Sequence, residues 1–498
     1  MSLRIRTWLV GVFLWLTVAP LAAQTASDTS TADTTVVAGA GYGLYGPLGW
    51  LQRWIFGSRH REIWAAPVEV ERFDLTSEAG GLTPIGADSG VRSGELYLRG
   101  VDGSVYTFNQ ISTDLGQLLP TGMRNDFVAG LTQDLQSGRH PGAPFVVPPL
   151  AAAAGLGPLP TPRLGILPQD ASLDRFSGTV GFLTPAIISP FRTRAGMADS
   201  AIPSSELIER LQTATPPAVD RKAYLRERMF DVYLGSWDPL PQDWLWRSDS
   251  TGAWKPEPRP RDFAFIRLDG MVAGLAGQQV PNFATFSKEY DTRLAVTARE
   301  RTLDRRLLPP LDRAAYVATA IALRDQMTDA VIEDAVSRLP RAYYDVEGEK
   351  LVRELKVRRD HLPEAAERYY RIVMSQADVY GSHGDDTVTA VRDADGMLEV
   401  DAGPRFQARF DPKQTDEVRL YLFEGADRVL VRGTGNKGPR LVIGGGPGDV
   451  VVDSTGIGQL TVHNAADVNI ETPGKVKREE DPLVPPSFTD TVIHEPPP

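Results

Sequence analysis

The feature of this 498-residue sequence that most constrains its fold is a change in the spacing of apolar residues near position 377. From 287 to 377 the apolar residues recur at helical intervals, as in the runs 316–323 and 365–373. After 377 the sequence changes to short β-branched runs that end at Gly, Asn or Asp. Because helices and strands need different apolar periods, the sequence predicts several packed helices followed by an all-β module over 379–472.

The all-β module is predicted to contain at least six strands. The β-branched runs that mark them are 418–422, 428–431, 440–443, 450–452, 459–462 and 468–470. Asp427, Asp449 and Asp467 precede successive strands at intervals of roughly 20 residues, which is typical of the coils of a β-solenoid or of a meander. The charged, Pro-rich tail over 473–498 is predicted to be disordered.

The first 23 residues have the three parts of a secretory signal peptide. Arg4 and Arg6 precede an apolar run from Trp8 to Leu21, and the small pair Ala22-Ala23 follows. The apolar run is about 14 residues long, whereas a membrane-spanning helix needs roughly 20, so cleavage after Ala23 is favoured over an uncleaved anchor. We therefore expect an exported protein with a flexible leader over 24–40 and no transmembrane span once the signal is removed. Periplasm, outer-membrane surface and medium all remain open as its location.

The composition excludes several classes of site. The chain has no Cys, which rules out disulfides, thiolate metal sites and a cysteine nucleophile. The formal net charge is −11, and it would be −13 after loss of the two signal-peptide arginines, which argues against nucleic acid as a partner. The six His residues are scattered without the spacing of zinc ligands, so the sequence predicts no zinc site. Segments 444–449 and 385–386 are similar to calcium-binding turns, but we interpret them as ordinary turns.

Residues 41–200 are predicted to be rich in β-structure with Pro- and Gly-rich loops. In the stretch 92–110, apolar and polar residues alternate on both sides of an Asp102-Gly103 turn, which predicts a β-hairpin. Segments 140–170 and 213–220 are dense in Pro and Gly and are predicted to be loops or covering segments.

The segment from 226 to 270 has the side chains best suited to chemistry. It is predicted to form a helix that ends at Gly235, then a polar loop, then a short hairpin. Asp238 lies in the loop and Asp262 lies at the end of the hairpin. We expect the two carboxylates to converge on one cleft, roughly 4–8 Å apart, a separation at which they could share a metal ion.

This order of residues resembles the catalytic half of the atypical kinases, namely the phosphoinositide kinases, the HipA-type kinases and the secretory-pathway kinases. The resemblance implies that Asp238 is the catalytic Asp, that Asp243 is a metal ligand and that Asp262 begins a metal-binding triplet with Phe263 and Ala264. It also implies an α+β fold with a two-lobed kinase-like body. The N-lobe-like part would be 41–200 and the mainly helical C-lobe-like part would be 201–378.

Residues from about 41 to 430 also resemble a family of uncharacterised exported bacterial proteins. Members of that family have Gly-Asp-Trp-Asp-Arg-His followed by Arg-Asp-Arg-Asp. This chain has Gly235-Ser-Trp-Asp238-Pro-Leu and then Arg259-Pro-Arg-Asp262. Some members are fused to outer-membrane β-barrels or to metallophosphoesterase domains, which implies a partner in the cell envelope.

Two departures from the kinase pattern bear on activity. The Arg-His pair is replaced by Pro239-Leu240. The strand that carries a Lys in the kinases corresponds to residues 108–114, which include no basic residue. Loss of a cation that contacts the phosphates would lower the rate by a factor of about 100 or more. Arg99 and Arg261 are the candidates for a replacement cation.

The sequence therefore favours a degenerate kinase-like protein that acts in interaction or assembly with an outer-membrane partner and has no nucleotide cofactor. The alternative is a metal-dependent extracytoplasmic phosphotransferase or phosphohydrolase that uses Asp238 and Asp262 with a divalent metal.

Overall fold

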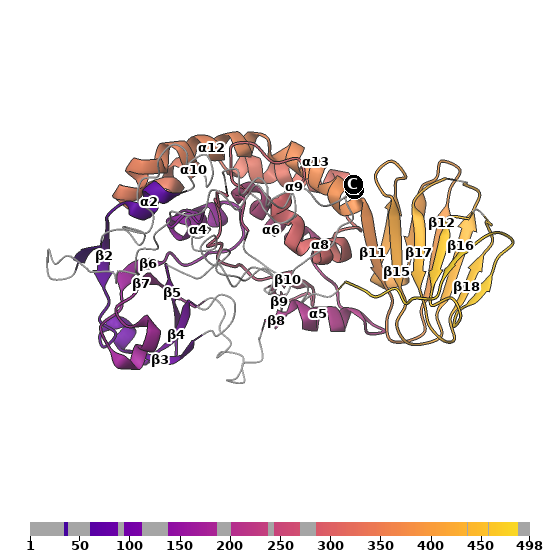
Figure 1. Cartoon of the computed structure of the whole chain (residues 1–498), viewed down its shortest axis with the longest axis horizontal. Coiled ribbons are helices and arrows are strands. Elements are labelled where there is room, and N and C mark those ends of the chain that lie inside the picture. Colours follow the sequence, from indigo (N-terminus) through magenta and orange to yellow (C-terminus); the bar gives the residue numbers. More distant parts are fainter. Residues whose placement is uncertain are drawn as a thin grey trace, which may run out of the picture.

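The protein is described here from a computed structural model. The described residues are 34–37, 60–87, 94–111, 138–186, 201–237, 244–268, 285–435, 437–456 and 458–486. They form a mixed α/β structure with a seven-stranded sheet at one end, helices in the middle and two further sheets at the other end (Figure 1). The predicted signal peptide, most of the predicted leader and the last twelve residues lie outside the described ranges.

The first sheet has the strand order β1-β2-β6-β7-β5-β4-β3. Its strands are β1 (Thr34–Val37), β2 (Val68–Arg72), β3 (Leu82–Ala87), β4 (Glu95–Gly100), β5 (Val105–Gln110), β6 (Arg163–Ile166) and β7 (Val180–Pro185). The predicted hairpin is confirmed, because β4 and β5 pair antiparallel with Glu95 opposite Asn109. Gly103 ends the turn at a φ of +81°, a left-handed conformation that glycine adopts without strain.

Strand β1 corrects the prediction that residues 24–40 have no structure. Thr34–Val37 pairs antiparallel with Val68–Glu71 at the edge of the sheet. The four residues are all β-branched, which favours a strand, but they are too few to predict one without knowledge of the partner strand.

A helix in the Pro-rich stretch 140–170 corrects a second prediction. Helix α4 (Ala143–Ala153) has Pro148 and Pro149 in its interior, although proline removes a helical hydrogen bond. Val146, Val147 and Leu150 are fully buried, so tertiary packing outweighs the local cost. In Figure 1, α4 lies between the seven-stranded sheet and α6.

The middle of the molecule is mainly helical. Its helices are α2 (Arg61–Ala65), α5 (Ser204–Leu211), α6 (Arg221–Leu234), α8 (Arg301–Leu307), α9 (Arg313–Gln326), α10 (Asp329–Ser337), α11 (Arg341–Tyr343), α12 (Glu349–Asp360) and α13 (Leu362–Met374). A small antiparallel sheet is formed by β8 (Ile202–Pro203), β9 (Leu245–Ser248) and β10 (Trp254–Pro256). The helical spacing predicted for 316–323 and 365–373 is confirmed in α9 and α13.

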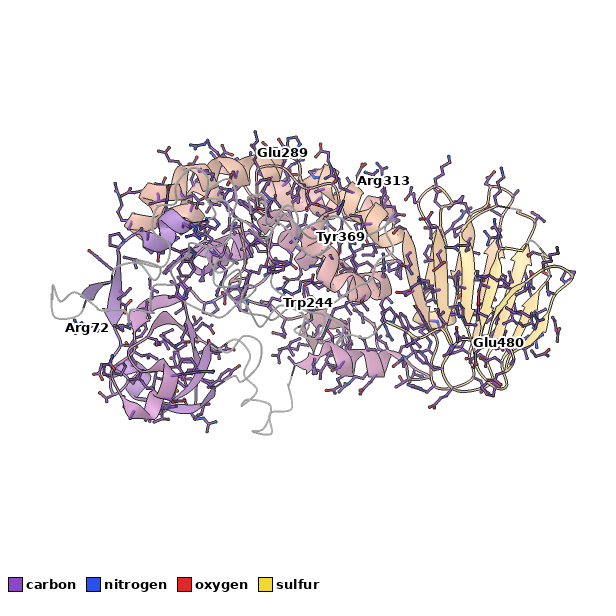
Figure 2. The ribbon with its side chains drawn as sticks, in the orientation of Figure 1. Arg72, Trp244, Glu289, Arg313, Tyr369 and Glu480 are labelled. Atoms are coloured by element: carbon purple, nitrogen blue, oxygen red, sulfur yellow. The ribbon has the colours of Figure 1, made fainter. Side chains whose placement is uncertain are left out.

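Buried aromatic side chains fill this helical part. Figure 2 labels two of them, Trp244 and Tyr369, in the middle of the molecule. The ring of Tyr224 lies 5.0 Å from that of Trp244, and Tyr316 lies 5.8 Å from Tyr369. Among the described residues, no helix is both long enough and apolar enough to cross a membrane.

Residues 376–479 form two sheets of mostly parallel strands. The five-stranded sheet consists of β11 (Gln376–Tyr380), β15 (Glu417–Tyr421), β17 (Arg440–Gly444), β19 (Leu460–His463) and β21 (Lys477–Glu479). The six-stranded sheet consists of β14 (Gln407–Phe410), β13 (Leu398–Asp401), β12 (Thr387–Arg392), β16 (Arg428–Gly433), β18 (Val450–Asp453) and β20 (Asn469–Glu471). From β15 onward the chain alternates between the two sheets, which is the path of a β-solenoid.

The strand register distinguishes this solenoid from a meander. Leu441 pairs in parallel with Val418 and with Leu460, and Val451 pairs in parallel with Val429. Consecutive strands of a meander would pair antiparallel instead. Each of the six β-branched runs found in the sequence corresponds to one of these strands.

Strand β21 corrects the prediction that the tail from 473 is disordered. Lys477–Glu479 pairs in parallel with Thr461–His463 and extends the five-stranded sheet. The charged composition of these residues suggested disorder, but the exposed edge of β19 supplies the hydrogen-bond partners that the segment lacks on its own.

Candidate functional site

Helix α6 ends where the sequence predicted. Asp220 caps its start by accepting a hydrogen bond from the backbone N–H of Ala223 at 2.9 Å. Gly235 has a φ of +60° and ends the helix, and the N–H of Ser236 donates to the carbonyl of Asp231 at 3.0 Å. This left-handed cap redirects the chain into the loop that begins at Ser236.

The end of α6 lies beside the segment that contains Asp262. The N–H of Trp237 donates to the carbonyl of Phe263 at 3.3 Å, and the N–H of Phe265 donates to the carbonyl of Leu234 at 3.0 Å. Asp238 and Asp243 themselves lie outside the described residues, so the predicted distance between Asp238 and Asp262 stays a prediction. The residue before Asp238 and the residue after Asp262 are nevertheless hydrogen-bonded to each other.

Asp262 lines a small cavity of about 130 Å³. Its walls come from one face of the seven-stranded sheet, from α4 and from the Pro260–Asp262 segment. Glu95, Thr107 and Asn109 are the polar side chains that β4 and β5 contribute. The opposite face of these strands packs on a small apolar core that includes Leu98 and Phe108.

Arg261 lines the same cavity, but acidic side chains already bind its guanidinium group. Its Nε donates to Asp231 at 2.7 Å, and one of its terminal nitrogens forms an ion pair with Glu227. The side chain is 1% exposed. Since both acceptors come from α6, the two ion pairs attach the Asp262 segment to that helix.

Asp231 and Arg261 belong to a larger buried ionic network. Arg228 donates to both oxygens of Asp304 at 2.9 and 3.1 Å, and it also lies 3.0 Å from Glu300. Arg259 lies 2.6 Å from Asp231. Isolated buried charges are unstable, so such a cluster depends on close pairing within it.

Burial and pairing set the protonation of this network. Burial raises the pKa of Glu300 to about 8 despite the nearby Arg228, so Glu300 keeps its proton at neutral pH. Burial alone would also raise the pKa of Asp231, but Arg259, Arg261 and Arg228 outweigh it and lower that pKa. The three arginines form ion pairs with Glu227, Asp231 and Asp304.

Arg99, the other candidate for a phosphate-binding cation, lies away from this cavity. It is on β4, opposite Val105, and its side chain is exposed. Strand alternation places it on the same face of the sheet as Glu95, but it is not among the described residues that line the cavity. The residues of β5 that line the cavity are Thr107 and Asn109, and both are uncharged.

Sequence reasoning missed a buried cluster of His60, His140 and Glu347. One potential ligand atom from each residue lies within 4.8 Å of the other two, the only such group of three among the described residues. Burial, aided by the neighbouring His60, lowers the pKa of His140 to about 3. Burial alone would raise the pKa of Glu347, but His60 pairs with it and lowers that pKa. The residues lie too far apart in sequence for any ligand spacing to reveal them.

The two turns that are similar to calcium sites use their carboxylates for backbone contacts. Asp449 accepts from the N–H of Asp427 at 2.9 Å and from the N–H of Gly446 at 2.8 Å. Asp385 accepts from the N–H of Ala426 at 2.8 Å, and Asp386 accepts from Ser382. These contacts explain the acidic residues as parts of solenoid turns.

Comparisons with known proteins add little to this geometry. No protein-family model matches the chain, and no curated protein matches it either. Among solved structures, it is similar to the crystal structure of a Helicobacter pylori proinflammatory kinase, CtkA, with 8% sequence identity and a TM-score of 0.32. That match covers 58% of this chain and 94% of the kinase chain. A TM-score of this size does not establish a shared fold, so the class that the structure itself defines is a mixed α/β protein.

Proposed function

We propose that this protein is a non-catalytic binding protein of the cell envelope, in which a degenerate kinase-like body holds the solenoid of residues 376–479 toward a partner. The observation that supports this most directly is the pairing of Arg261 with Glu227 and Asp231. Arg261 is the only basic residue among the described residues that line the cavity. A cation bound on both sides by carboxylates is not available for a phosphate group.

The size of the cavity supports the same proposal. Pockets that bind drug-sized ligands usually measure roughly 300–1,000 Å³. The cavity that the described residues line, about 130 Å³, is smaller than such pockets. Phosphoryl transfer depends on positioning and on charges that stabilise the transferred group, and the described walls offer neither the room nor a free cation.

A second candidate function is metal-dependent phosphotransfer or phosphohydrolysis by Asp238 and Asp262. The hydrogen bond from Trp237 to Phe263 favours it, because it brings together the chain segments next to the two acids. Both proposals predict that the segments meet. They differ in whether nucleotide and metal bind there.

Nucleotide binding and phosphotransfer separate the two candidates. The purified protein is titrated with Mg²⁺ and Mn²⁺, with and without ATP, while its melting temperature and the transfer of labelled γ-phosphate are followed. A binding protein gives no ATP-dependent shift, and its transfer stays at the level of the Asp262→Asn variant. Saturable ATP binding, with transfer that is lost in Asp238→Asn and Asp262→Asn, would replace the proposal with the enzyme.

The envelope location has its own test. Export with cleavage after Ala23 predicts a mature protein that begins at Gln24 and occurs in the extracytoplasmic fractions. Cell fractionation followed by intact-mass measurement checks both points. Recovery of the whole chain with residues 1–23 in the cytoplasm would contradict this part of the proposal.

A further inference from the structure

Three buried side chains from distant parts of the chain meet near the Asp262 segment. His60 immediately precedes α2, His140 lies just before α4, and Glu347 lies in a π-helical turn over Tyr344–Gly348 that leads into α12. His60 and His140 are each 1% exposed, and Glu347 is 8% exposed. π-Helical turns inside helices occur frequently at functional sites.

The hydrogen bonds of His60 show that its Nδ1 atom needs a positive species as its partner. Its Nε2 lies 2.8 Å from the carbonyl oxygen of Phe265, and because a carbonyl only accepts, Nε2 has to carry a proton. Its Nδ1 lies 2.7 Å from Oε2 of Glu347. In a neutral ring Nδ1 would point a lone pair at the carboxylate. Either a proton lies between these two atoms, or a metal ion lies beside them and binds both.

His140 favours the metal ion over the proton. Its Nδ1 accepts a hydrogen bond from the N–H of Gly142 at 3.1 Å, while its Nε2 is buried and has no hydrogen-bond partner in the described structure. Its ring lies 4.8 Å from that of His60. Buried polar atoms without a partner are rare in folded proteins. Because Nδ1 accepts, a neutral His140 carries its proton on Nε2, and a proton shared by His60 and Glu347 leaves this N–H group unpaired. A metal ion would bind Nε2 once that proton has moved to Nδ1.

We propose that His60, His140 and Glu347 hold a divalent transition-metal ion of the zinc class. Two imidazoles and one carboxylate form a ligand set typical of zinc, while calcium and magnesium prefer oxygen ligands throughout. The Phe265 carbonyl fixes the His60 ring, and Arg267 lies 3.0 Å from the other oxygen of Glu347. Such outer contacts usually orient the residues that bind a metal.

Metal binding requires two changes of protonation. The proton shared by His60 and Glu347 leaves to solvent, and the proton of His140 moves from Nε2 to Nδ1 as Nε2 binds the ion. Two donors cannot face each other, so the N–H of Gly142 turns away from Nδ1 and its hydrogen bond is given up. One neutral hydrogen bond changes an equilibrium by roughly tenfold, whereas structural zinc sites bind with constants of about 10⁷ M⁻¹ or more. The lost hydrogen bond is therefore small compared with the metal contacts.

The proposed ion would join segments that are far apart in sequence. It would link the chain before α2, the chain before α4 and the start of α12, and through the Phe265 carbonyl it would also fix the Asp262 segment. Phe265 has a φ of +61°, a left-handed conformation that is strained for an aromatic residue and needs support from its surroundings. All three ligand residues are buried, so the role is structural and does not depend on the proposed function.

The experiment uses the full mature chain without a histidine tag. The protein is refolded with and without Zn²⁺, and bound metal is measured by mass spectrometry, together with the melting temperature and the visible spectrum of a Co²⁺-loaded sample. We expect about one zinc per chain, a higher melting temperature with zinc, and the spectrum of Co²⁺ with nitrogen and oxygen ligands. Metal well below one equivalent, with a melting temperature unaffected by zinc, would overturn the proposal in favour of a shared proton.

Variants locate the ion. His140→Ala should weaken zinc binding by at least about 100-fold. The matched control is His383→Ala, which changes a half-exposed histidine far from the site in sequence and should leave zinc binding unchanged. A folded His140→Ala protein that binds zinc like the wild type would overturn the assignment. If that variant does not fold, the stoichiometry and melting temperature of the wild-type protein still decide the question.

Discussion

Nε of Arg261 donates a hydrogen bond to Asp231 at 2.7 Å, so the residue next to Asp262 is bound to the last turn of helix α6. The contact is buried and lies within a network of three arginines. Arg261 is therefore part of the internal structure, although its position in the sequence made it a candidate for binding phosphate.

Replacing Arg261 should destabilise the protein strongly. Arg261→Met leaves Glu227 and Asp231 with one fewer buried partner, and breaking a buried ion pair in this way costs about 3–5 kcal/mol. The matched control is Arg338→Met, because the ion pair between Arg338 and Asp334 is exposed and should contribute about 0.5 kcal/mol or less. Urea denaturation of both variants measures the difference. A loss below about 1 kcal/mol for Arg261→Met would show that its guanidinium is not needed for folding.

Glu300→Gln should stabilise the protein at alkaline pH. Burial raises the pKa of Glu300 to about 8, above its ordinary value of 4.5, so the folded state holds a proton that the unfolded state releases. The stability that this proton contributes is complete below pH 4.5 and is lost as the pH rises through 8. Gln resembles the protonated acid, and we expect the variant to be more stable by about 2–4 kcal/mol at pH 9 and nearly unchanged at pH 5. Melting temperatures over that pH range test it, and equal curves would contradict the protonated state.

Asp427→Asn, in the solenoid, should also stabilise the protein, and this gain should begin at a lower pH than that of Glu300→Gln. Burial, followed by repulsion from Asp449, raises the pKa of Asp427 to about 7, although the backbone N–H of Asp386 donates to it and opposes the shift. Stability from this group is complete below pH 3.8 and is lost as the pH rises through 7. At pH 8 we expect the free energy of unfolding of the variant to be about 1–2 kcal/mol higher than that of the wild type. This gain is smaller than the whole pKa shift implies, because nearby solvent screens part of the unfavourable interaction of the carboxylate.

The control for Asp427→Asn is Asp467→Asn. Asp467 also precedes a solenoid strand, but its side chain is exposed. Its replacement should change stability by no more than about 0.5 kcal/mol at any pH. Chemical denaturation at pH 5 and pH 8 compares the two variants, and an equal response would show that the burial of Asp427 is not the cause.

Gly235→Ala should destabilise the protein more than Gly252→Ala does. Both glycines have a positive φ, +60° and +84°, which costs an alanine roughly 1–2 kcal/mol. A Cβ on Gly235 would also lie 2.9 Å from a ring carbon of Phe286, while a Cβ on Gly252 would meet nothing within 4 Å. In urea denaturation we therefore expect Gly235→Ala to lower the free energy of unfolding by about 1 kcal/mol or more beyond the loss in the control, Gly252→Ala. Equal losses would mean that the ring of Phe286 moves away freely.

Local patterns in the sequence were enough to predict several elements. Apolar spacing and Gly235 marked the end of α6, and the Asp102-Gly103 turn marked the β4–β5 hairpin. These elements form from residues close in sequence, so their signals are local. Whether the later strands form a solenoid or a meander depends on which strands pair, and that is decided by contacts about 20 residues apart.

The site could be predicted only in part, for the same reason. The sequence placed Asp262 near the end of α6, and the contact between Trp237 and Phe263 agrees with that order. The roles of Arg261 and His60 depend on partners 30 and 287 residues away, Asp231 and Glu347. Helix α4 was missed because its prolines disfavour a helix locally, while the burial that stabilises it comes from the rest of the fold.

The final strand of the solenoid affects how copies of the molecule behave toward one another. A parallel sheet that ends at an open edge offers unpaired backbone groups to the next copy, which is how fibres begin. Here the edge strand β21 reads Lys477-Arg478-Glu479, and the side chain of Lys477 is 70% exposed. Addition of a further strand along this edge would strip water from these charged side chains, which is costly. The charged strand that completes the sheet thus also disfavours pairing of its edge with another chain.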